Sequence, residues 1–447
     1  MGPRLIRAFV RALLAIFYRR VDVAGLEHVP SSGPLLVAGN HQNGLVDPML
    51  LIATMPRTLR PLAKSNLFRH PLIAPFLALA RALPVYRRQD ADGDTKRNVE
   101  TFHAVSDALA QGEAIVIFPE GVSQPEPALQ TLRTGAARLL LDAEAAGALP
   151  VTLLPVGIVV NEPGRFRSGH ALVLIGAPVP LDDCRALAAR EPVAGVRMLT
   201  ERLTEALRRQ IIEAEDRDTL RLLRVIERVW REESGTAPEP RSAAWLQRAS
   251  RAYRWLRVSA PAEVESFRQE VETYADELDR IGVRPETLGR RYAPSVVARY
   301  TAREILPLLL GLPLAAVGMV LHALPYHLLG WGVRLARPDA DTEATYKLAG
   351  GIVIYPLAWA LEAWLVRRWA GTRWLVVFLL ALLPCGFFAL AWQARLQNVA
   401  REARGLLHFL ARRGLHERLV ERRHALADEI ERLAARVPEA VLAGERS

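Results

Sequence analysis

The fold is set by residues 35–48, which read LLVAGNHQNGLVDP. The short apolar run Leu35–Gly39 is typical of a buried strand, and polar residues follow it at once. Asp47-Pro48 then predicts a helix start, because aspartate is favoured at the N-cap and proline at the first helical position. Strand, turn and helix in this order are the repeating unit of a layered α/β fold.

The same alternation extends over residues 21–182, where short apolar or β-branched runs alternate with helical ones. Helices are predicted over 95–111 and 129–146, each closed by a glycine, Gly112 and Gly147. These elements predict an α/β domain, a mixed sheet with flanking helices. The further strand candidates are Val21–Gly25, Ala82–Val85, Ala114–Phe118, Thr152–Val160 and Ala171–Ile175.

His41, Asp47 and Glu120 carry the candidate chemistry. His41 and Glu120 each follow the carboxyl end of a predicted strand, where open α/β sheets bind ligands. A carboxylate fixes the tautomer of a neutral imidazole and stabilises the imidazolium, so the pair can take a proton from a hydroxyl. In the plainer alternatives, Asp47 is only a helix cap and Glu120 a solvated loop acid. A metal site of these three residues with His70 matches no familiar metal motif, and no metal is expected.

Composition indicates a membrane-associated chain. Of the 447 residues, 51% are hydrophobic and the net charge is +10, with a pI near 10.1 and mean hydropathy of +0.10. These values suit a protein seated on an anionic membrane, whereas no nucleic-acid-binding signature is present. The two cysteines, Cys184 and Cys385, are far apart, which favours a reducing, cytoplasm-facing location.

Residues 1–20 predict an amphipathic helix, because five arginines alternate with apolar residues at helical spacing. One interpretation is an interfacial helix with its apolar face in lipid and its arginines among headgroups. The alternative is a helix docked on the protein core, since periodicity alone does not distinguish lipid from core.

The remainder is predicted to be all-α, with C-terminal transmembrane helices. Residues 183–300 are helical and charged, and 304–394 contain three apolar runs, of which the first and last are long enough to span a bilayer. Six of the nine tryptophans lie between Trp331 and Trp392, near the ends of these runs. The first run contains three prolines, so two topologies stay open: three crossings, or a re-entrant first segment followed by a two-helix hairpin. Residues 395–447 predict a basic amphipathic helical tail.

Four short blocks occur in order between residues 21 and 180: Asn40-His41 to Asp47, Pro84-Val85-Tyr86-Arg87, Phe118-Pro119-Glu120-Gly121 and Leu154-Pro155-Val156-Gly157-Ile158. Together they resemble the blocks of the glycerolipid acyltransferases related to bacterial 1-acylglycerol-3-phosphate acyltransferase. The resemblance implies that His41 is the general base and Asp47 its orienting partner. It also implies that Arg87 contacts the acceptor phosphate, and that Glu120 and Gly121 belong to the acceptor site.

This chain departs from the family pattern in its spacing and in its third block. Five residues separate His41 from Asp47 where most members have four, and Val122-Ser123 replace the usual Thr-Arg. These features look more like the branch that includes fungal glycerol-3-phosphate and dihydroxyacetone-phosphate acyltransferases. Arginine suits phosphate through its bidentate fork. The candidate phosphate-binding residues are Arg87, Arg88, Arg133 and Lys64.

The expected activity is transfer of a fatty acyl group from acyl-CoA or acyl-carrier protein to a glycerol phosphate or lysophospholipid, without a bound cofactor. The expected setting is a bacterial-type inner membrane with the catalytic domain facing the cytoplasm. Residues of 67–77 are candidates for the acyl groove or for ordinary core: Leu67, Phe68, Leu72, Ile73, Phe76 and Leu77. Two alternatives are a serine esterase or thioesterase using Ser123 or Ser65, and a non-catalytic lipid-binding scaffold. Against the esterase, the chain lacks a G-x-S-x-G elbow.

Overall fold

The chain forms two compact units. The first comprises Met1–Arg217 and Val333–Gly351, and the second Asp218–Gly332 and Ile352–Ser447. We refer to them as unit 1 and unit 2. The computed structural model describes residues 3–71, 73–86, 98–124, 126–147, 149–160, 170–212, 214, 216–235, 241–283, 288, 294–339, 342–411 and 414–443.

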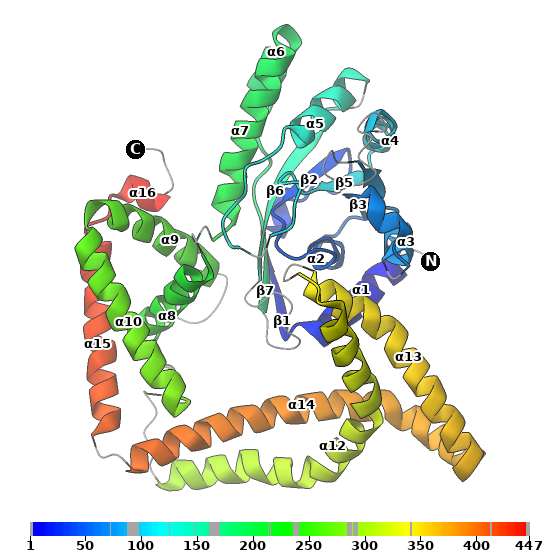
Figure 1. Ribbon diagram of the computed structural model, residues 1–447. Coiled ribbons are helices and arrows are strands. Elements are labelled where there is room, and N and C mark those ends of the chain that lie inside the picture. Colours follow the sequence, from blue (N-terminus) through cyan, green and yellow to red (C-terminus); the bar gives the residue numbers. More distant parts are fainter. Residues whose placement is uncertain are drawn as a thin grey trace. The chain divides into compact units, whose positions relative to one another are not determined.

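Unit 1 is built on a seven-stranded mixed sheet (Figure 1), which confirms the predicted fold class. The strand order is β1-β7-β6-β2-β5-β3-β4, and neighbours are parallel except for the antiparallel pair β6 and β7. Strand β3 was not among the predicted strands, because Pro61 and two basic residues hide its strand pattern. The strands are β1 (Arg20–Ala24), β2 (Leu35–Gly39), β3 (Leu59–Lys64), β4 (Leu83–Val85), β5 (Ala114–Ile117), β6 (Thr152–Val160) and β7 (His170–Ile175).

Helices cover both faces of the sheet, which explains why the central strand is apolar throughout. Leu35 and Val37 of β2 pack in one buried cluster with α1 and α2, while Leu36 and Ala38 pack in another with α4, α5 and α7. A strand buried on both faces reads as a continuous hydrophobic run. The helices of unit 1 are α1 (Pro3–Phe17), α2 (Val46–Thr54), α3 (Ala74–Leu79), α4 (Asn98–Ala110), α5 (Gly135–Ala145), α6 (Asp182–Arg190) and α7 (Pro192–Gln210).

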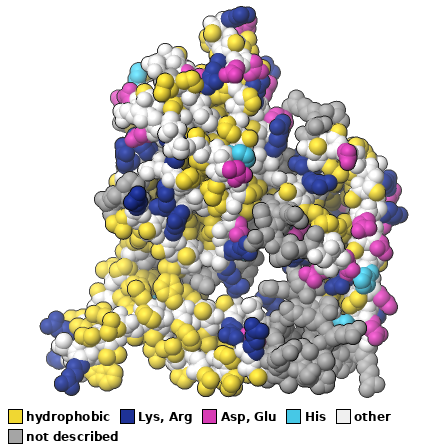
Figure 2. Space-filling model, turned by 180° about the vertical axis from the view of Figure 1, so that it is seen from behind, with side chains coloured by type: hydrophobic (Ala, Val, Ile, Leu, Met, Phe, Trp, Pro, Cys, Tyr) yellow, Lys and Arg dark blue, Asp and Glu magenta, His cyan; other side chains and the backbone are white. Residues whose placement is uncertain are grey.

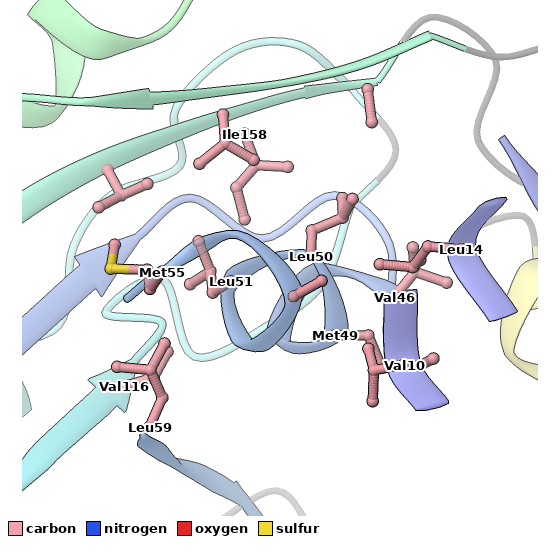
Figure 3. Packing of buried hydrophobic residues seen from close by; sticks show 14 of the residues in the cluster. Val10, Leu14, Val46, Met49, Leu50, Leu51, Met55, Leu59, Val116 and Ile158 are labelled. Atoms are coloured by element: carbon pink, nitrogen blue, oxygen red, sulfur yellow. The ribbon is translucent and has the colours of Figure 1, made fainter. Parts of the chain in front are cut away.

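The N-terminal helix α1 docks on α2 through its apolar face. Val10 and Leu14 lie beside Val46 and Met49 of α2 (Figure 3), and all four are at most 5% exposed. Arg7 donates to the carbonyls of Pro56 and Arg57 just past the end of α2, at 3.0 and 2.8 Å, and Arg11 to that of Ala53 at 2.7 Å. The apolar face is therefore docked on the protein core, as in the second interpretation, and does not have the lipid-facing placement of the interfacial interpretation.

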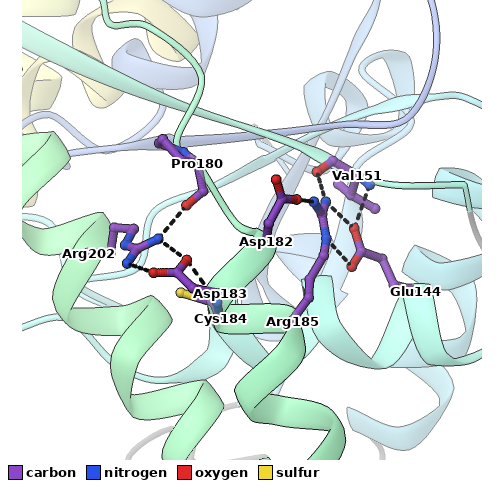
Figure 4. A network of polar contacts seen from close by, with 8 residues as sticks. All are labelled: Glu144, Val151, Pro180, Asp182, Asp183, Cys184, Arg185 and Arg202. Atoms are coloured by element: carbon purple, nitrogen blue, oxygen red, sulfur yellow. Dashed lines mark hydrogen bonds and ion pairs between the residues drawn. The ribbon is translucent and has the colours of Figure 1, made fainter.

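The α/β unit extends beyond the predicted boundary at residue 182. Buried leucines of α7 join the cluster over the sheet, and α6 is held by ion pairs (Figure 4). Arg185 pairs with Glu144 of α5 at 2.7 Å, and Arg202 of α7 pairs with Asp183. The predicted boundary at residue 182 was wrong, because charged helical sequence continues without a break from the end of unit 1 into unit 2. Only the residues from Asp218 onward belong to unit 2.

Unit 2 is entirely helical in its described residues. Helix α9 packs against α10 and α16, and α15 packs against α10. Arg422 and Arg423 of α15 pair with Glu277 and Glu233 at 3.2 and 2.5 Å. The predicted separate tail, 395–447, therefore packs with the charged helices of 218–283. Two of its helices, α12 and α13, continue into the Val333–Gly351 segment of unit 1. The helices are α8 (Arg217–Ser234), α9 (Arg241–Ser259), α10 (Pro261–Ile281), α12 (Pro294–Ala336), α13 (Glu343–Ala370), α14 (Thr372–Ala411), α15 (Leu415–Ala434) and α16 (Glu439–Ala443).

Three helices of the described chain are long and apolar enough to cross a membrane: Ala302–Ala336, Glu343–Ala370 and Thr372–Arg401, with mean hydropathies of 2.1, 1.5 and 2.5. Hydrophobic side chains gather over these helices, with basic side chains at one end (Figure 2). Within unit 2, α12 and α14 pack closely. The Trp392 indole donates to the Leu308 carbonyl at 2.9 Å, and a Cβ at Gly318 would lie 2.1 Å from the Cys385 carbonyl oxygen. Small residues permit such close approach of apolar helices.

Candidate active site

The candidate site lies where two neighbouring parallel strands end. Strands β2 and β5 are paired with Ala38 opposite Ile117, so the turns that follow them meet at one edge of the sheet. Those turns carry His41 and Glu120, and the backbone amide of His41 donates to Glu120 Oε1 at 2.7 Å. The placement predicted from the sequence is therefore observed.

His41 and Asp47 form a hydrogen-bonded pair. His41 Nδ1 lies 2.9 Å from Asp47 Oδ2, and the same oxygen accepts the backbone amides of Gln42 and Asn43, each at 2.7 Å. Asp47 is fully buried. It is not the N-cap of α2, since Leu45 takes that position and Asp47 lies in the first turn. Because the turn folds back over the helix start, the carboxylate serves both the turn and the imidazole.

The pair fixes which imidazole nitrogen is available for chemistry. A carboxylate accepts only, so Nδ1 carries the proton and Nε2 carries the basic lone pair. The His41 side chain is 15% exposed, lines a cavity, and stacks on the Phe118 ring with centroids 4.2 Å apart and planes at 16°. The imidazole is therefore held by the Asp47 bond and by the ring face together.

Glu120 joins two loops rather than pointing freely into solvent. Its Oε1 accepts the His41 amide and its Oε2 accepts the Gln130 amide at 3.0 Å, and the residue is 5% exposed. Burial raises the pKa of Glu120 to about 7, although both backbone amides favour the ionised form. Its predicted place in the acceptor site stays a prediction, while its bonds to the backbone hold the His41 turn.

Tyr18 lies behind the pair, at the end of α1. Its hydroxyl accepts from Asn43 Nδ2 at 3.4 Å and the residue is 1% exposed. Burial, followed by the nearby Asp47 carboxylate, raises the pKa of the Tyr18 hydroxyl above its usual value. The phenol therefore stays neutral and adds no second negative charge beside Asp47.

A cavity of about 770 Å³ adjoins His41 and lies wholly within unit 1. Much of its wall is apolar, and Lys64 and Arg133 add basic side chains. Gly121 has a φ of +72°, and a Cβ there would lie 2.8 Å from Arg133 Nε, so glycine at this position allows the guanidinium to lie against the turn. Apolar lining residues include Ile6, Val10, Met49, Ile52, Leu67, Ile73, Phe76 and Leu77.

Most of the predicted site residues that the structure describes come together at this cavity. His41, Lys64, Gly121 and Arg133 line it, as do His70 and Ser123 of the alternatives. Ser65 is buried and is not among the lining residues. In the described part of the chain, no group of three His, Cys, Asp or Glu is placed to hold a metal. Arg87, Arg88 and Leu72 lie outside the described residues, and Phe68 is not a lining residue.

Three residues outside the predicted set also shape the site. Phe118 stacks on the imidazole, and Asn40 exchanges two hydrogen bonds with the Ile158 backbone, at 2.9 and 2.6 Å, which tie the turn to β6. Both residues stand in the quoted blocks, so their position beside His41 and Glu120 was a usable signal. Thr345 accepts the Leu45 amide at 3.1 Å, and no local pattern identifies it, because about 300 residues separate the two.

Comparison with known proteins finds relatives of the domain that carries this site. The sequence profile of the Acyltransferase family matches residues 20–159. Over 200 residues the chain is 27% identical to 1-acyl-sn-glycerol-3-phosphate acyltransferase of Bacillus subtilis, covering 44% of this chain and 89% of that protein. Over 145 residues it is 30% identical to glycerol-3-phosphate O-acyltransferase 2 of Saccharomyces cerevisiae, covering 32% of this chain and 19% of that protein.

Other relatives match over part of their length. Chloroplastic 1-acyl-sn-glycerol-3-phosphate acyltransferase LPAT1 of Arabidopsis thaliana is 24% identical over 166 residues, which are 36% of this chain. The chain spans 44% of that protein and 45% of an uncharacterized acyltransferase of Schizosaccharomyces pombe. The crystal structure of the 1-acyl-sn-glycerophosphate acyltransferase PlsC from Thermotoga maritima aligns with a TM-score of 0.33 and 22% identity, covering 44% of this chain and 79% of that one.

The profile match contains β1 to β6 and both turns of the site. Residues 20–159, which carry the His41–Asp47 pair and Glu120, therefore match the Acyltransferase family profile, and the chain is similar to 1-acyl-sn-glycerol-3-phosphate acyltransferases.

Proposed function

We propose that this protein is a membrane-bound O-acyltransferase that transfers a fatty acyl group from an acyl-CoA or acyl-carrier-protein thioester to a hydroxyl of a glycerol phosphate or lysophosphatidate. The observation that carries the proposal is the His41–Asp47 pair at 2.9 Å on the wall of a cavity with apolar and basic sides. The apolar side suits an acyl chain, and Lys64 and Arg133 suit a phosphate.

The geometry supports direct transfer without an acyl-enzyme. His41 Nε2 takes the proton of the acceptor hydroxyl, and the oxygen attacks the thioester carbonyl carbon. Asp47 Oδ2 stabilises the imidazolium through Nδ1–H. When the tetrahedral intermediate collapses, the carbon–sulfur bond breaks and the imidazolium returns its proton to the leaving thiolate. The oxygen ester and the free thiol are the products.

The test is an acyl-transfer assay with purified protein in lipid nanodiscs, a labelled acyl thioester, and three acceptors: glycerol 3-phosphate, lysophosphatidate and dihydroxyacetone phosphate. His41→Ala should lower turnover by at least roughly a hundredfold, the lower range for loss of a general base. His103→Ala is the matched control, because His103 is exposed on α4. Unchanged turnover in His41→Ala would overturn the base assignment, and thioester hydrolysis that is independent of acceptor would favour an esterase using Ser123, which lines the cavity.

For the membrane segments, we propose that α13 and α14 cross the bilayer as a hairpin and that α12 enters and leaves on one side. Val333–Gly351, which holds the end of α12 and the start of α13, belongs to unit 1 with the acyltransferase domain. No candidate span lies among the described residues before α12, so the start of α12 is on the same side of the membrane as the acyltransferase domain. The end of α12 is on that side too, because it belongs to unit 1. Three prolines inside α12 fit a re-entrant helix.

Cysteine labelling tests this topology. In a chain without Cys184 and Cys385, single cysteines at Ala370, in the α13–α14 turn, and at Val193, exposed on α7, are treated with a membrane-impermeant maleimide in sealed vesicles. The proposal expects the two sites to label from opposite sides. Labelling from the same side would instead support three crossings.

A further inference from the structure

The segment that joins two of the apolar helices is part of the acyltransferase unit. Residues Val333–Gly351 cluster with residues 1–217, and Ala344 and Leu348, 0% and 8% exposed, pack in the same buried cluster as α2 and the sheet. We call this segment the linker. It is about 300 residues away from the catalytic turn in sequence, so its role at the site is set by packing alone.

The linker also forms part of the cavity wall. The Tyr346 ring lies edge-on to the His70 ring, with centroids 6.3 Å apart and planes at 80°. Both residues line the cavity, together with Arg337, Asp339 and Thr342 of the linker. Substrate in the cavity would therefore contact residues of the N-terminal α/β segment and of the linker.

One linker side chain reaches the turn between His41 and Asp47. Thr345 is 4% exposed, and its Oγ1 accepts the backbone N–H of Leu45 at 3.1 Å. Leu45 is the N-cap of α2 and its side chain makes no cap hydrogen bond. The amides before and after it already have partners inside the turn: Asp47 Oδ2 accepts those of residues 42 and 43, and the Asn43 carbonyl those of residues 46 and 47.

We propose that Thr345 is a positioning residue, whose hydroxyl holds the five-residue stretch between His41 and Asp47 in the geometry that keeps the imidazole bonded to the carboxylate. This inference rests on the proposed function. Without the hydroxyl, the Leu45 amide at the start of α2 has no acceptor in the turn. A part-buried helix-start amide without a partner is costly, so the turn shifts toward water and carries Asp47 with it.

Kinetics in nanodiscs test the proposal. Thr345→Val keeps the shape and removes the acceptor. It should lower kcat by roughly tenfold, the cost of leaving one part-buried donor unsatisfied, with KM for both substrates within about twofold. Thr345→Ala should behave in the same way, and Thr345→Ser, which restores the oxygen, should return kcat to within about threefold of wild type. The control is Thr200→Val, because the Thr200 hydroxyl bonds only to its own helix, at Val196 O.

A double mutant separates positioning from general stability. In an Asp47→Ala background no side chain at position 47 holds the imidazole, so adding Thr345→Val should lower kcat by less than about twofold. Wild-type kcat in Thr345→Val, or a tenfold loss in both backgrounds, would overturn the proposal.

Hydrogen exchange decides the contact independently of activity. Amide exchange in a peptide covering residues 41–50 should be on the order of tenfold faster in Thr345→Val than in wild type. If wild type transfers no acyl group, the proposed function fails, while this measurement still tests the hydrogen bond from Leu45 to Thr345. Unchanged exchange in that peptide would show that Thr345 does not hold the turn.

Discussion

Replacing Asp47 by asparagine removes one charge and little else from the site. The carboxamide oxygen can still accept the amides of Gln42 and Asn43, so the turn is retained. What is lost is the attraction between the carboxylate and the imidazolium that forms when His41 takes a proton. At a separation of 2.9 Å and an effective dielectric of about 20, that attraction is about 6 kcal/mol.

Part of this energy survives the substitution, because a neutral hydrogen bond of about 1 kcal/mol remains and the 15% exposure of His41 admits some screening. A net loss of about 4 kcal/mol predicts that kcat falls roughly a thousandfold, at 1.36 kcal/mol for each factor of ten. KM should change little, because the carboxylate does not touch substrate.

The assay is steady-state acyl transfer, with thermal unfolding measured on the same samples. Asp107→Asn, an exposed acid on α4, is the matched control for the change in charge. A kcat for Asp47→Asn within about tenfold of wild type, in a folded sample, would refute the view that the carboxylate stabilises an imidazolium in the reaction.

Three further predictions concern the frame of the site. Glu120 has a pKa of about 7 against an ordinary 4.5, so between these values the folded chain holds a proton that the unfolded chain has lost, and stability falls as pH rises. This fall, up to about 3 kcal/mol in urea unfolding between pH 4.5 and 7, should be missing from Glu120→Gln, and equal pH slopes would contradict it. Gly121→Ala should cost about 1–2 kcal/mol of stability at a positive φ and raise KM for the phosphate-bearing acceptor by displacing Arg133; an unchanged KM would count against a phosphate role for Arg133. Leu50→Ala, fully buried between α2 and the sheet, should cost about 2–5 kcal/mol, and a loss of less than about 1 kcal/mol would show that the cluster repacks.

The elements that position the base were predictable because their signals are local. The strand Leu35–Gly39 was predicted with the observed bounds, and Ala114–Phe118 differs by one residue. Both run in parallel next to each other, so the turns after them had to meet, which brought His41 to Glu120. Periodicity and turn chemistry suffice for such features.

The features that were missed depend on contacts between distant parts of the chain. Pro61 masked β3, which is stabilised by its neighbours β5 and β4 rather than by its own sequence. The end of the α/β unit at Arg217 depends on leucines of α7 that look like any amphipathic helix. Thr345 has no motif at all, since only packing of the linker brings it to Leu45.

The contact between Thr345 of the linker and Leu45 limits how far this protein can be shortened to obtain a soluble fragment. A fragment that ends at residue 217 lacks the apolar helices and would retain the imidazole, its carboxylate and both adjoining loops. It would nevertheless discard the hydroxyl at 345 and lay bare the apolar surface under Ala344 and Leu348. The fragment should therefore have lower turnover than the full chain and a newly exposed apolar surface. A chimaera in which residues 333–351 are fused to the fragment should restore the hydroxyl and cover that surface.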